Sequence, residues 1–386
     1  MRVAVFGAGF SGAACARSLA DNGCTVKVFE RRGHIGGNAY DYGDGMGILV
    51  QKYGPHIFHT NSERVYRFLS RFTEWVPYRH RVLGYIDGMY VPIPFNLKSL
   101  EMLFEGQKAA RIADVLKREY GEGSTVPVLR LRAHPDTEIA AFGEYVYQKV
   151  FYNYTVKQWG FSPDELPARV TARVPVRISY EDGYFTDKYQ CMPAQGFTRL
   201  IENMLSHPNI ELELGCDKKL GFGGGTITID GESIGEDDRI VYTGCLDELL
   251  ENRLGELQYR SLRFEFETHA LSHFQPAAVV NHPGEGEFTR VTEFTKFTCP
   301  PQSHTVTVTE FPMPHRQGIT VPCYPVEREE NTATYRGYVD FFKSFPAFHA
   351  LGRLAEYKYY NMDAAVENAL AFADGLSSAR SLKQQV

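Results

Sequence analysis

The chain has 386 residues, enough for two or three domains, and its 43% hydrophobic and 23% charged residues are an ordinary composition for a soluble globular protein. Its net charge of −6 argues against nucleic acid as a general partner. No stretch reaches the roughly 18 apolar residues of a membrane span, and the first residues read as a strand, so we expect neither a membrane partner nor a signal peptide. The seven cysteines lack paired spacing, which favours reduced thiols in a cytoplasmic protein.

The first twenty residues have the order of a dinucleotide-binding turn. Residues 2–6 are a short apolar run that reads as a buried parallel strand, and residues 13–19 continue as a helix. Between them lie Gly7, Ala8, Gly9, Phe10, Ser11 and Gly12. The first glycine would make the tight turn, the second would let backbone approach a pyrophosphate, and the third would let helix and strand pack closely. The pyrophosphate would lie at the helix N-terminus, where unpaired N–H groups point at it.

An acidic residue and a second pair of glycines follow. The expected strand 25–29 ends in Glu30, which can accept both ribose hydroxyls of an adenosine. The next residues, before a second helix could form, include Arg31, Gly36, Gly37 and Asn38. A nicotinamide dehydrogenase has no need of these glycines, whereas a long flavin dinucleotide needs more backbone to approach it. The stretch favours FAD over NAD and resembles the two-dinucleotide-binding-motif flavoproteins, which include amine oxidases, desaturases and a sugar mutase.

The next hundred residues combine hairpins with helices. Residues 43–60 read as a hairpin and loop that carries His56 and His59, and because no third ligand lies nearby we expect no metal there. A helix is expected from about residue 61 to 72, and residues 75–92 read as a hairpin turning at Asp87 and Gly88. Helical spacing then recurs over residues 97–104, 109–119 and 139–154, which predicts a small inserted helical domain.

The second half of the chain returns to strands. Residues 161–195 read as extended, and a helix is expected over 195–205. Strands are expected at 210–214, 226–229 and 240–244, the last of which would end over the cofactor. Strong alternation over 259–325 predicts an antiparallel sheet, and residues 361–374 read as a final helix after which the last dozen polar residues are expected to fray.

These elements predict an α/β fold with a Rossmann-like FAD-binding domain of the GR2 type, an inserted helical domain and an antiparallel β-sheet layer. The FAD-binding domain is expected to be discontinuous. The expected boundaries are 1–80 with 195–255 and 330–386 for the FAD-binding domain, 95–165 for the helical domain with its substrate loop, and 80–95, 166–194 and 256–329 for the antiparallel sheet domain.

Ten strings spread over essentially the whole chain resemble the bacterial UDP-galactopyranose mutase family. They are GAGFSGA, GGNAYD, GPHIFHT, PIPFN, YTVKQWG, ARVPVR, YFTDKYQ, FTRVTEF, YPV and GRLAEYKYYNMD. YTVKQWG and GRLAEYKYYNMD are the specific ones, because neither is general to flavoproteins. The resemblance implies an isomerase of cell-wall polysaccharide biosynthesis that interconverts UDP-galactopyranose and UDP-galactofuranose.

The family's chemistry uses reduced FAD without net redox change. N5 of the flavin attacks the anomeric carbon, displaces UDP and forms a covalent flavin–sugar adduct that opens and recloses on another hydroxyl. The implied partners are therefore a nucleotide-sugar substrate and NAD(P)H or another reductant. Bacterial members commonly dimerise, so a homodimer is expected.

The resemblance also assigns the binding residues. A helix start near the isoalloxazine would favour an anionic reduced flavin. The further flavin contacts it implies are His56, Ile57, Arg353, Tyr360, Asn361, Met362 and Asp363. The implied substrate contacts are His80, Phe151, Tyr154, Thr155, Trp159, Arg173, Tyr184, Asn281, Arg290, Tyr324, Tyr359 and Asn361.

Two of these substrate contacts, together with His59, are the candidate catalytic groups. Arg173, in a Pro-flanked loop, and Arg290 carry guanidinium forks that suit a diphosphate bidentately. His59 matches the histidine on the flavin face, where it would tune N5 and the sugar hydroxyls. Tyr154 and Trp159, five residues apart at the end of a helix, offer aromatic faces for the base, although packing residues would have the same spacing.

Two departures from the family bear on which substrate is bound. Asn361 stands where many members carry an acid near the sugar, and His80 stands where some relatives have Asn. A related mutase acting on a GDP- or N-acetyl-sugar is therefore an alternative. A flavin amine oxidase or desaturase would share the first forty residues without needing the diphosphate arginines, and a non-catalytic prenyl-protein carrier shares the fold family without keeping flavin.

Overall fold

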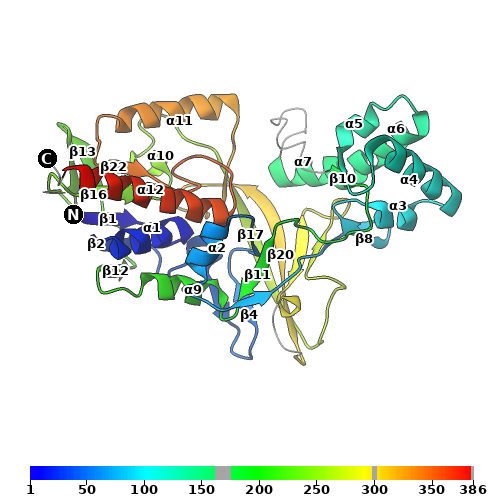
Figure 1. Ribbon diagram of the computed structural model, residues 1–386, viewed down its shortest axis with the longest axis horizontal. Helices are drawn as coiled ribbons and strands as arrows, with labels where there is room; N and C mark the ends of the chain where they lie inside the picture. Colours follow the sequence, from blue (N-terminus) through cyan, green and yellow to red (C-terminus); the bar gives the residue numbers. More distant parts are fainter. Residues whose placement is uncertain (161–174, 298–301, 384–386) are drawn as a thin grey trace.

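The centre of the fold is a five-stranded parallel sheet (Figure 1). The structure is a computed structural model that describes residues 1–160, 175–297 and 302–383. The strand order is β12-β2-β1-β16-β22, and every neighbouring pair is parallel. The strands are β1 (Arg2–Phe6), β2 (Thr25–Glu30), β12 (Ile210–Leu214), β16 (Arg239–Tyr242) and β22 (Phe348–Ala350). This sheet confirms the predicted Rossmann-like α/β unit and its first strand.

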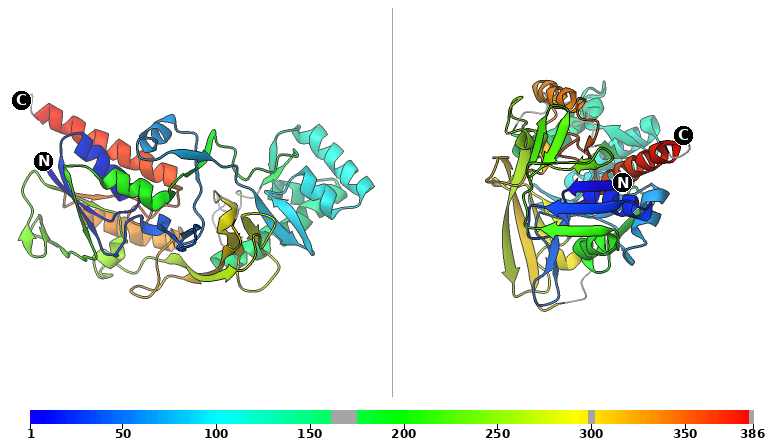
Figure 2. Two further views of the ribbon diagram at one scale, coloured as in Figure 1. Left: turned by 90° about the horizontal axis from the view of Figure 1, so that it is seen from below. Right: turned by 90° about the vertical axis from the view of Figure 1, so that its left-hand side faces the viewer.

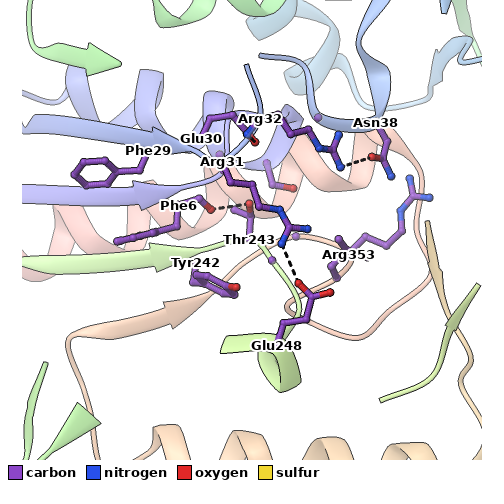
Figure 3. A pocket seen from close by; sticks show the side chains of 18 of the residues that line it. Phe6, Phe29, Glu30, Arg31, Arg32, Asn38, Tyr242, Thr243, Glu248 and Arg353 are labelled. Atoms are coloured by element: carbon purple, nitrogen blue, oxygen red, sulfur yellow. Dashed lines mark hydrogen bonds and ion pairs between the residues drawn. The ribbon is translucent and has the colours of Figure 1, made fainter. Parts of the chain in front are cut away.

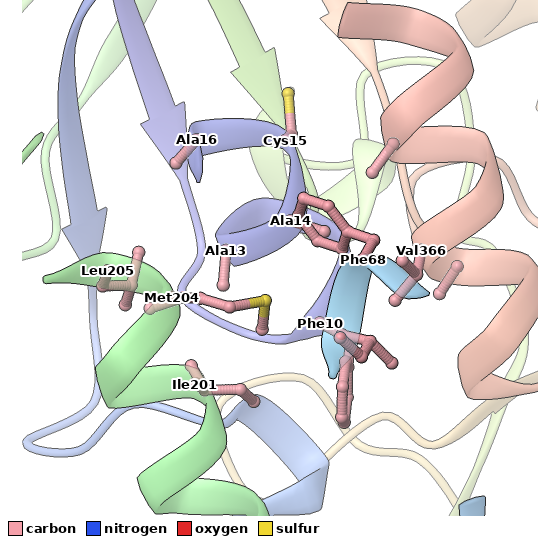
Figure 4. Close-up of a cluster of buried hydrophobic side chains, with 14 of the residues drawn as sticks. Phe10, Ala13, Ala14, Cys15, Ala16, Phe68, Ile201, Met204, Leu205 and Val366 are labelled. Atoms are coloured by element: carbon pink, nitrogen blue, oxygen red, sulfur yellow. The ribbon is translucent and has the colours of Figure 1, made fainter. Parts of the chain in front are cut away.

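Helices pack on this sheet through small side chains. They are α1 (Phe10–Asp21), α2 (Glu63–Leu69), α9 (Gly196–Leu205) and α12 (Met362–Lys383). Figure 2 shows α12 lying beside α1, whose buried alanines allow the close approach. Side chains of all four helices meet in one buried cluster, which includes Phe10, Phe68, Met204 and Val366 (Figure 4).

The end of the chain differs from the expectation. The helix expected over residues 361–374, with a frayed tail, instead continues to Lys383. A contact explains part of the extension, because the Asn22 side-chain amide donates to the Ser377 hydroxyl at 3.1 Å. The sequence of the tail is polar, so the apolar pattern alone underestimated the length of α12.

A seven-stranded sheet lies between the parallel sheet and the helical end of the molecule (Figure 1). Its order is β21-β17-β20-β19-β18-β7-β8, and all pairs are antiparallel except β18 with β7. The strands are β7 (Val82–Ile86), β8 (Met89–Ile93), β17 (Tyr259–His269), β18 (Val279–Asn281), β19 (Arg290–Glu293), β20 (Thr305–Pro314) and β21 (Tyr324–Pro325). The predicted layer is present, with one parallel pair that the alternation could not reveal.

The helical unit forms the end of the molecule opposite the parallel sheet (Figure 1). Its elements are α3 (Leu97–Leu103), α4 (Gly106–Tyr120), α5 (Val128–Arg132), α6 (Thr137–Val146), η2 (Tyr147–Tyr152) and α7 (Asn153–Trp159). Asn96 caps α3 by accepting from the backbone N–H groups of Lys98 and Ser99. The single helix expected over 139–154 is wrong in detail, because six residues of π-helix, η2, interrupt it.

Smaller elements connect these layers. β5 (Phe58–Thr60), β11 (Tyr189–Pro193) and β6 (Trp75–Pro77) form a three-stranded sheet. The remaining elements are η1 (Gly37–Ala39), β3 (Asp41–Gly43), β4 (Leu49–Gln51), β9 (Thr125–Pro127), β10 (Pro175–Arg177), β13 (Leu220–Gly223), β14 (Thr226–Ile229), β15 (Glu232–Ser233), α10 (Leu246–Leu249), η4 (Phe294–Lys296) and α11 (Glu329–Phe342). Within the described parts of the chain, no helix has both the length and the apolar character that a membrane crossing requires.

Candidate functional site

A cavity of about 600 Å³ opens where β1, β2 and β16 end. Ligands of open α/β sheets bind at the carboxyl ends of the strands, so its place in the fold is that of a cofactor site. The glycine turn after β1 is fixed sterically. A side chain at Gly12 would place its Cβ 1.9 Å from the Gly7 carbonyl oxygen, and Gly7 itself has a φ of +110°.

The second glycine pair packs directly against the first. Gly36 donates its N–H to the Ala8 carbonyl at 2.9 Å. A Cβ on Gly37, whose φ is +56°, would lie 3.1 Å from the Gly9 Cα. The two loops therefore form a single all-backbone cradle at the cavity, which explains why the sequence needs glycines in both places.

Charged side chains line the cavity beyond the cradle (Figure 3). Glu30 accepts from the backbone N–H groups of Ala8 and Arg32, at 2.8 and 2.9 Å. Arg31 pairs with Glu248 at 2.9 Å, across the cavity. These contacts fix the carboxylate at the end of β2, where a ribose was expected.

Arg32 is a lining residue that the sequence reasoning did not select. Its Nη2 donates to the Asn38 side chain at 3.0 Å, while its buried Nη1 has no hydrogen-bond partner within the described residues. A buried guanidinium nitrogen without a partner is costly, and an anionic ligand would satisfy it. Together with the glycine cradle, this donor shows that the cavity fits a dinucleotide pyrophosphate. The signal was available in the sequence, because Arg32 follows the acid at the end of β2.

Most of the predicted flavin residues line this one cavity. They are Gly7, Gly9, Phe10, Ser11, Gly12, Glu30, Arg31, Gly37, Asn38, His56, Arg353 and Met362. The other four are not lining residues. Ile57 and Tyr360 pack against the core, Asn361 is exposed and precedes α12, and Asp363 accepts from the Thr60 hydroxyl at 3.0 Å.

At the far end of the cavity, His56 is held as a neutral ring. Its Nδ1 contacts the Gly54 carbonyl at 2.9 Å, so this nitrogen carries the proton. Burial, and then the charges of Arg353 and Arg290, lower the pKa of His56 to about 4. The N-terminus of α12 begins here at Met362, which adds the positive end of a helix dipole.

Beyond His56 lies a group of cations and phenols, here called the arginine–tyrosine cluster. Its members are Arg260, Arg290, Arg353, Tyr154, Tyr324 and Tyr359. The guanidinium carbons of Arg353 and Arg260 lie 4.9 and 5.3 Å from the Tyr324 ring, which stacks on Tyr359 at 5.2 Å. Burial raises the pKa values of Tyr154 and Tyr324, so both phenols remain protonated donors.

The three arginines of the cluster outnumber the carboxylates hydrogen-bonded to its members. Glu310, 1% exposed, accepts from Nε of Arg290 at 2.7 Å. A second carboxylate, Glu327, adjoins the cluster and accepts from the backbone N–H of Tyr359 at 2.7 Å. Burial opposes the charge on Arg290, but Glu310 outweighs it and raises the pKa of the guanidinium. The cluster therefore carries excess positive charge in an otherwise acidic protein, which suits a diphosphate.

Arg260 was missed from the sequence, although a signal existed. Side chains two residues apart on a strand share one face, so Arg260 lies on the same face of β17 as Leu262 and Phe264. A charged residue on an otherwise apolar face is the signal that the sequence offered. The register of β17 with β21 sets Arg260 opposite Tyr324. Asn281, a predicted substrate contact, lies next to the cluster because it is paired in register with Arg290 across β18 and β19.

Two predicted histidines adjoin the cluster. Burial, and then the charge of Arg290, lowers the pKa of His80 to about 3, so this ring is neutral. His59 stacks on Phe185, with ring centroids 3.6 Å apart, and its Nδ1 lies 3.0 Å from an Asp187 oxygen. His80 stacks on Phe185 and Tyr184 meets it edge-on, so these side chains form one aromatic cluster.

Phe151, the residue predicted to stack on the base, is buried in the helical unit. It is 2% exposed and packs inside the helical core. It lies on η2, where its ring contacts that of Tyr147, so its role toward the base stays a prediction. Thr155 is also buried, at 4% exposure. Trp159 is the last residue of α7, and Arg173 lies outside the described residues.

No cluster of three or more potential metal ligands was found in the part of the chain that the structure describes.

Comparisons with known proteins identify the family. The UDP-galactopyranose mutase family profile matches residues 149–359, more than half of the chain, and an NAD(P)-binding Rossmann-like domain profile matches residues 5–72. A probable UDP-galactopyranose mutase of Klebsiella pneumoniae is 35% identical over 375 residues, covering 96% of this chain and 94% of that protein. A dTDP-fucopyranose mutase of Escherichia coli is also 35% identical, over 376 residues that cover 96% and 97% of the two chains.

Solved structures agree on the fold. A crystal structure of reduced UDP-galactopyranose mutase matches with a TM-score of 0.74 at 17% identity, covering 98% of this chain and 94% of that one. Putrescine oxidase bound to putrescine matches with a TM-score of 0.58 at 12% identity, over 98% and 99% of the two chains. The glycine cradle, the arginine–tyrosine cluster and these matches lead to one conclusion: the chain belongs to the UDP-galactopyranose mutase family.

Proposed function

We propose that this protein is an FAD-dependent nucleotide-sugar mutase that interconverts UDP-galactopyranose and UDP-galactofuranose without net redox change. The observation that carries the proposal is the arginine–tyrosine cluster, because its three guanidinium groups outnumber the two carboxylates, Glu310 and Glu327, that accept hydrogen bonds from its members, and Arg353 of the cluster lines the dinucleotide cavity. A simple amine oxidase has no use for such a cationic cluster. Membership of a mutase family supports the same reading.

Different residues of this chain would contact the diphosphate and the sugar of the substrate. Arg260 and Arg290 would neutralise the substrate diphosphate, and the protonated phenols of Tyr154 and Tyr324 would donate to its oxygens. Because neutral His80 adds no charge, it would contact the sugar as a hydrogen-bonding group. Stabilising the diphosphate matters for the reaction, since negative charge develops there when the anomeric bond breaks.

The cofactor would occupy the 600 Å³ cavity. The glycine cradle and Arg32 would hold the pyrophosphate, Glu30 would accept from the ribose, and Arg353 and the start of α12 would adjoin the flavin ring. When bound and reduced, FAD supplies the nucleophile for the anomeric carbon. The positive end of the α12 dipole would favour the anionic reduced form.

A second substrate class has specific support. The dTDP-fucopyranose mutase relative is as similar to this chain as the UDP-galactopyranose mutase relative, each being 35% identical. Fucose lacks a hydroxyl that galactose carries, and Asn361, the residue expected near the sugar, is neutral in this chain. A dTDP-linked deoxy sugar is therefore the alternative substrate.

The test is a substrate panel with the purified, dithionite-reduced holoenzyme. Three substrates are tested separately: UDP-galactose, dTDP-fucose and a GDP-sugar. Each is incubated with the enzyme, and its pyranose and furanose forms are then separated by ion-pair chromatography. We expect UDP-galactofuranose to be converted fastest. Faster conversion of the dTDP-linked sugar would establish the alternative, and no conversion of any pair by flavin-loaded enzyme would overturn the mutase assignment.

A further inference from the structure

Asp187 is held in a fixed position beside His59. One carboxylate oxygen lies 3.0 Å from Nδ1 of His59, and the other accepts from the Asn61 side-chain amide at 3.1 Å. The Asn61 amide oxygen in turn accepts from the Lys188 N–H at 2.9 Å. Both Asp187 oxygens are engaged, so the carboxylate has little freedom to rotate.

The sheet register sets this arrangement. Gln190 on β11 is paired directly with His59 on β5. The Gln190 side chain donates back to the carbonyls of Asp187 and Phe185, at 3.0 and 3.3 Å. The segment before β11 is therefore folded over the His59 ring, with Phe185 on its face and Asp187 at its edge.

The contact decides which ring nitrogen carries the proton. An ionised carboxylate only accepts hydrogen bonds, so Nδ1 of His59 must be the donor. In the neutral ring, Nε2 then has a lone pair and no proton. Among the described residues Nε2 has no hydrogen-bond partner, and the side chain is 13% exposed. The free nitrogen belongs to a ring in the same aromatic cluster as His80 and Tyr184.

We propose that Asp187 is a positioning residue of the reaction, which holds His59 against Phe185 in the Nδ1–H tautomer and so keeps Nε2 as a hydrogen-bond acceptor for the bound sugar. The inference rests on the proposed function, since it assigns the sugar to the site beside His59. Asp187 itself contacts no substrate and acts only through the histidine.

The substitution Asp187→Asn makes a sharp prediction. Because Asn61 donates to one side-chain oxygen, the new amide would keep its oxygen toward Asn61 and turn its NH₂ group toward Nδ1 of His59. Nδ1 would then have to accept, and the ring would switch to the Nε2–H tautomer. The tautomer is read from side-chain ¹⁵N shifts of ¹⁵N-histidine-labelled holoenzyme, with His59→Gln to assign the signal.

We expect the wild type to show the Nδ1–H form of His59 and Asp187→Asn to show the Nε2–H form. Relative to the wild type, Asp187→Asn should have a kcat that is lower by about tenfold or more, a similar KM, and the same flavin content and unfolding temperature. In a His59→Gln background, Asp187→Asn should lower kcat no further. Asp182→Asn is the matched control, because this acid lies on the same segment but pairs with Arg79 and Arg81.

Three results would overturn the positioning role of Asp187. The first is an unchanged His59 tautomer in Asp187→Asn, and the second is a changed tautomer with an unchanged kcat. The third is a double variant of His59→Gln and Asp187→Asn in which the two losses of kcat are additive. Failure of the proposed function looks different. The wild type and Asp182→Asn would then both convert no nucleotide sugar, while the ¹⁵N shifts would still show whether Asp187 sets the ring.

Discussion

The pair between Arg290 and Glu310 allows stability and activity to be separated. Glu310 has a side chain only 2% exposed, and Arg290 one that is 25% exposed. Arg290→Met would leave the buried carboxylate without its 2.7 Å partner. Breaking a fully buried pair costs about 3–5 kcal/mol, and the partial exposure of Arg290 reduces our expectation to about 2–4 kcal/mol.

The double variant Arg290→Met with Glu310→Gln should recover most of this stability, to within about 1 kcal/mol of the wild type, because no uncompensated charge remains buried. Activity should not recover, since the guanidinium that we propose contacts the substrate diphosphate is still missing. Urea unfolding of the holoenzyme measures the first quantity, and kcat/KM with the preferred nucleotide sugar measures the second.

A control pair and a clear contrary result complete the test. Arg132 and Glu144 form a more exposed pair, with side chains 33% and 46% exposed, so Arg132→Met should cost no more than about 1 kcal/mol and leave kcat/KM unchanged. If the double variant regained wild-type kcat/KM along with its stability, Arg290 would be a structural residue only and the diphosphate assignment would fail.

Three further predictions concern the cofactor, acid stability and the helical core. Gly12→Ala should abolish flavin retention, because the new Cβ would lie 1.9 Å from a carbonyl oxygen. The control Gly33→Ala, whose Cβ meets nothing within 4 Å, should retain flavin. Retention is measured as the flavin-to-protein absorbance ratio, and equal ratios in the two variants would contradict the role of the glycine cradle. The pKa of His80 is lowered from 6.5 to about 3, so between these two pH values the unfolded chain binds a proton that the folded one does not. This residue should therefore lower the stability on acidification, by about 2 kcal/mol between pH 7 and pH 5. Urea unfolding at pH 5 and 7 should show that loss of stability reduced in His80→Gln but not in the exposed His273→Gln, and an unchanged loss in both would refute the burial argument. Phe151→Ala should cost about 3–5 kcal/mol in unfolding free energy because it empties a buried site, and a weaker nucleotide affinity without loss of stability would show that it is a stacking residue after all.

Local patterns in the sequence predicted the cofactor half of the protein well. The turn from Gly7 to Gly12 joins adjacent elements, so its geometry depends on residues that are neighbours in the chain. The same holds for the hairpin at Asp87 and Gly88, which both have positive φ as a tight turn requires.

The substrate half depends on register, which the sequence does not show. Arg260 meets Tyr324 only because β17 pairs with β21, and Glu310 meets Arg290 only because β20 pairs with β19. The burial of Phe151 also could not be read from the sequence, because the π-helix η2 changes which residues of an apolar helix face inward. The domain boundaries, the roles of the site residues, the reductant and the homodimer stay predictions.

The central claim is that a reduced flavin rearranges a nucleotide sugar and is not consumed. The most direct measurement incubates anaerobically reduced holoenzyme with excess UDP-galactofuranose, or with the preferred sugar from the substrate panel, and follows both the sugar isomers and the flavin spectrum. We predict many turnovers per flavin, a spectrum that is still reduced at the end, and no turnover by the oxidised enzyme. Flavin oxidation in proportion to product, or equal turnover by the oxidised enzyme, would contradict the account.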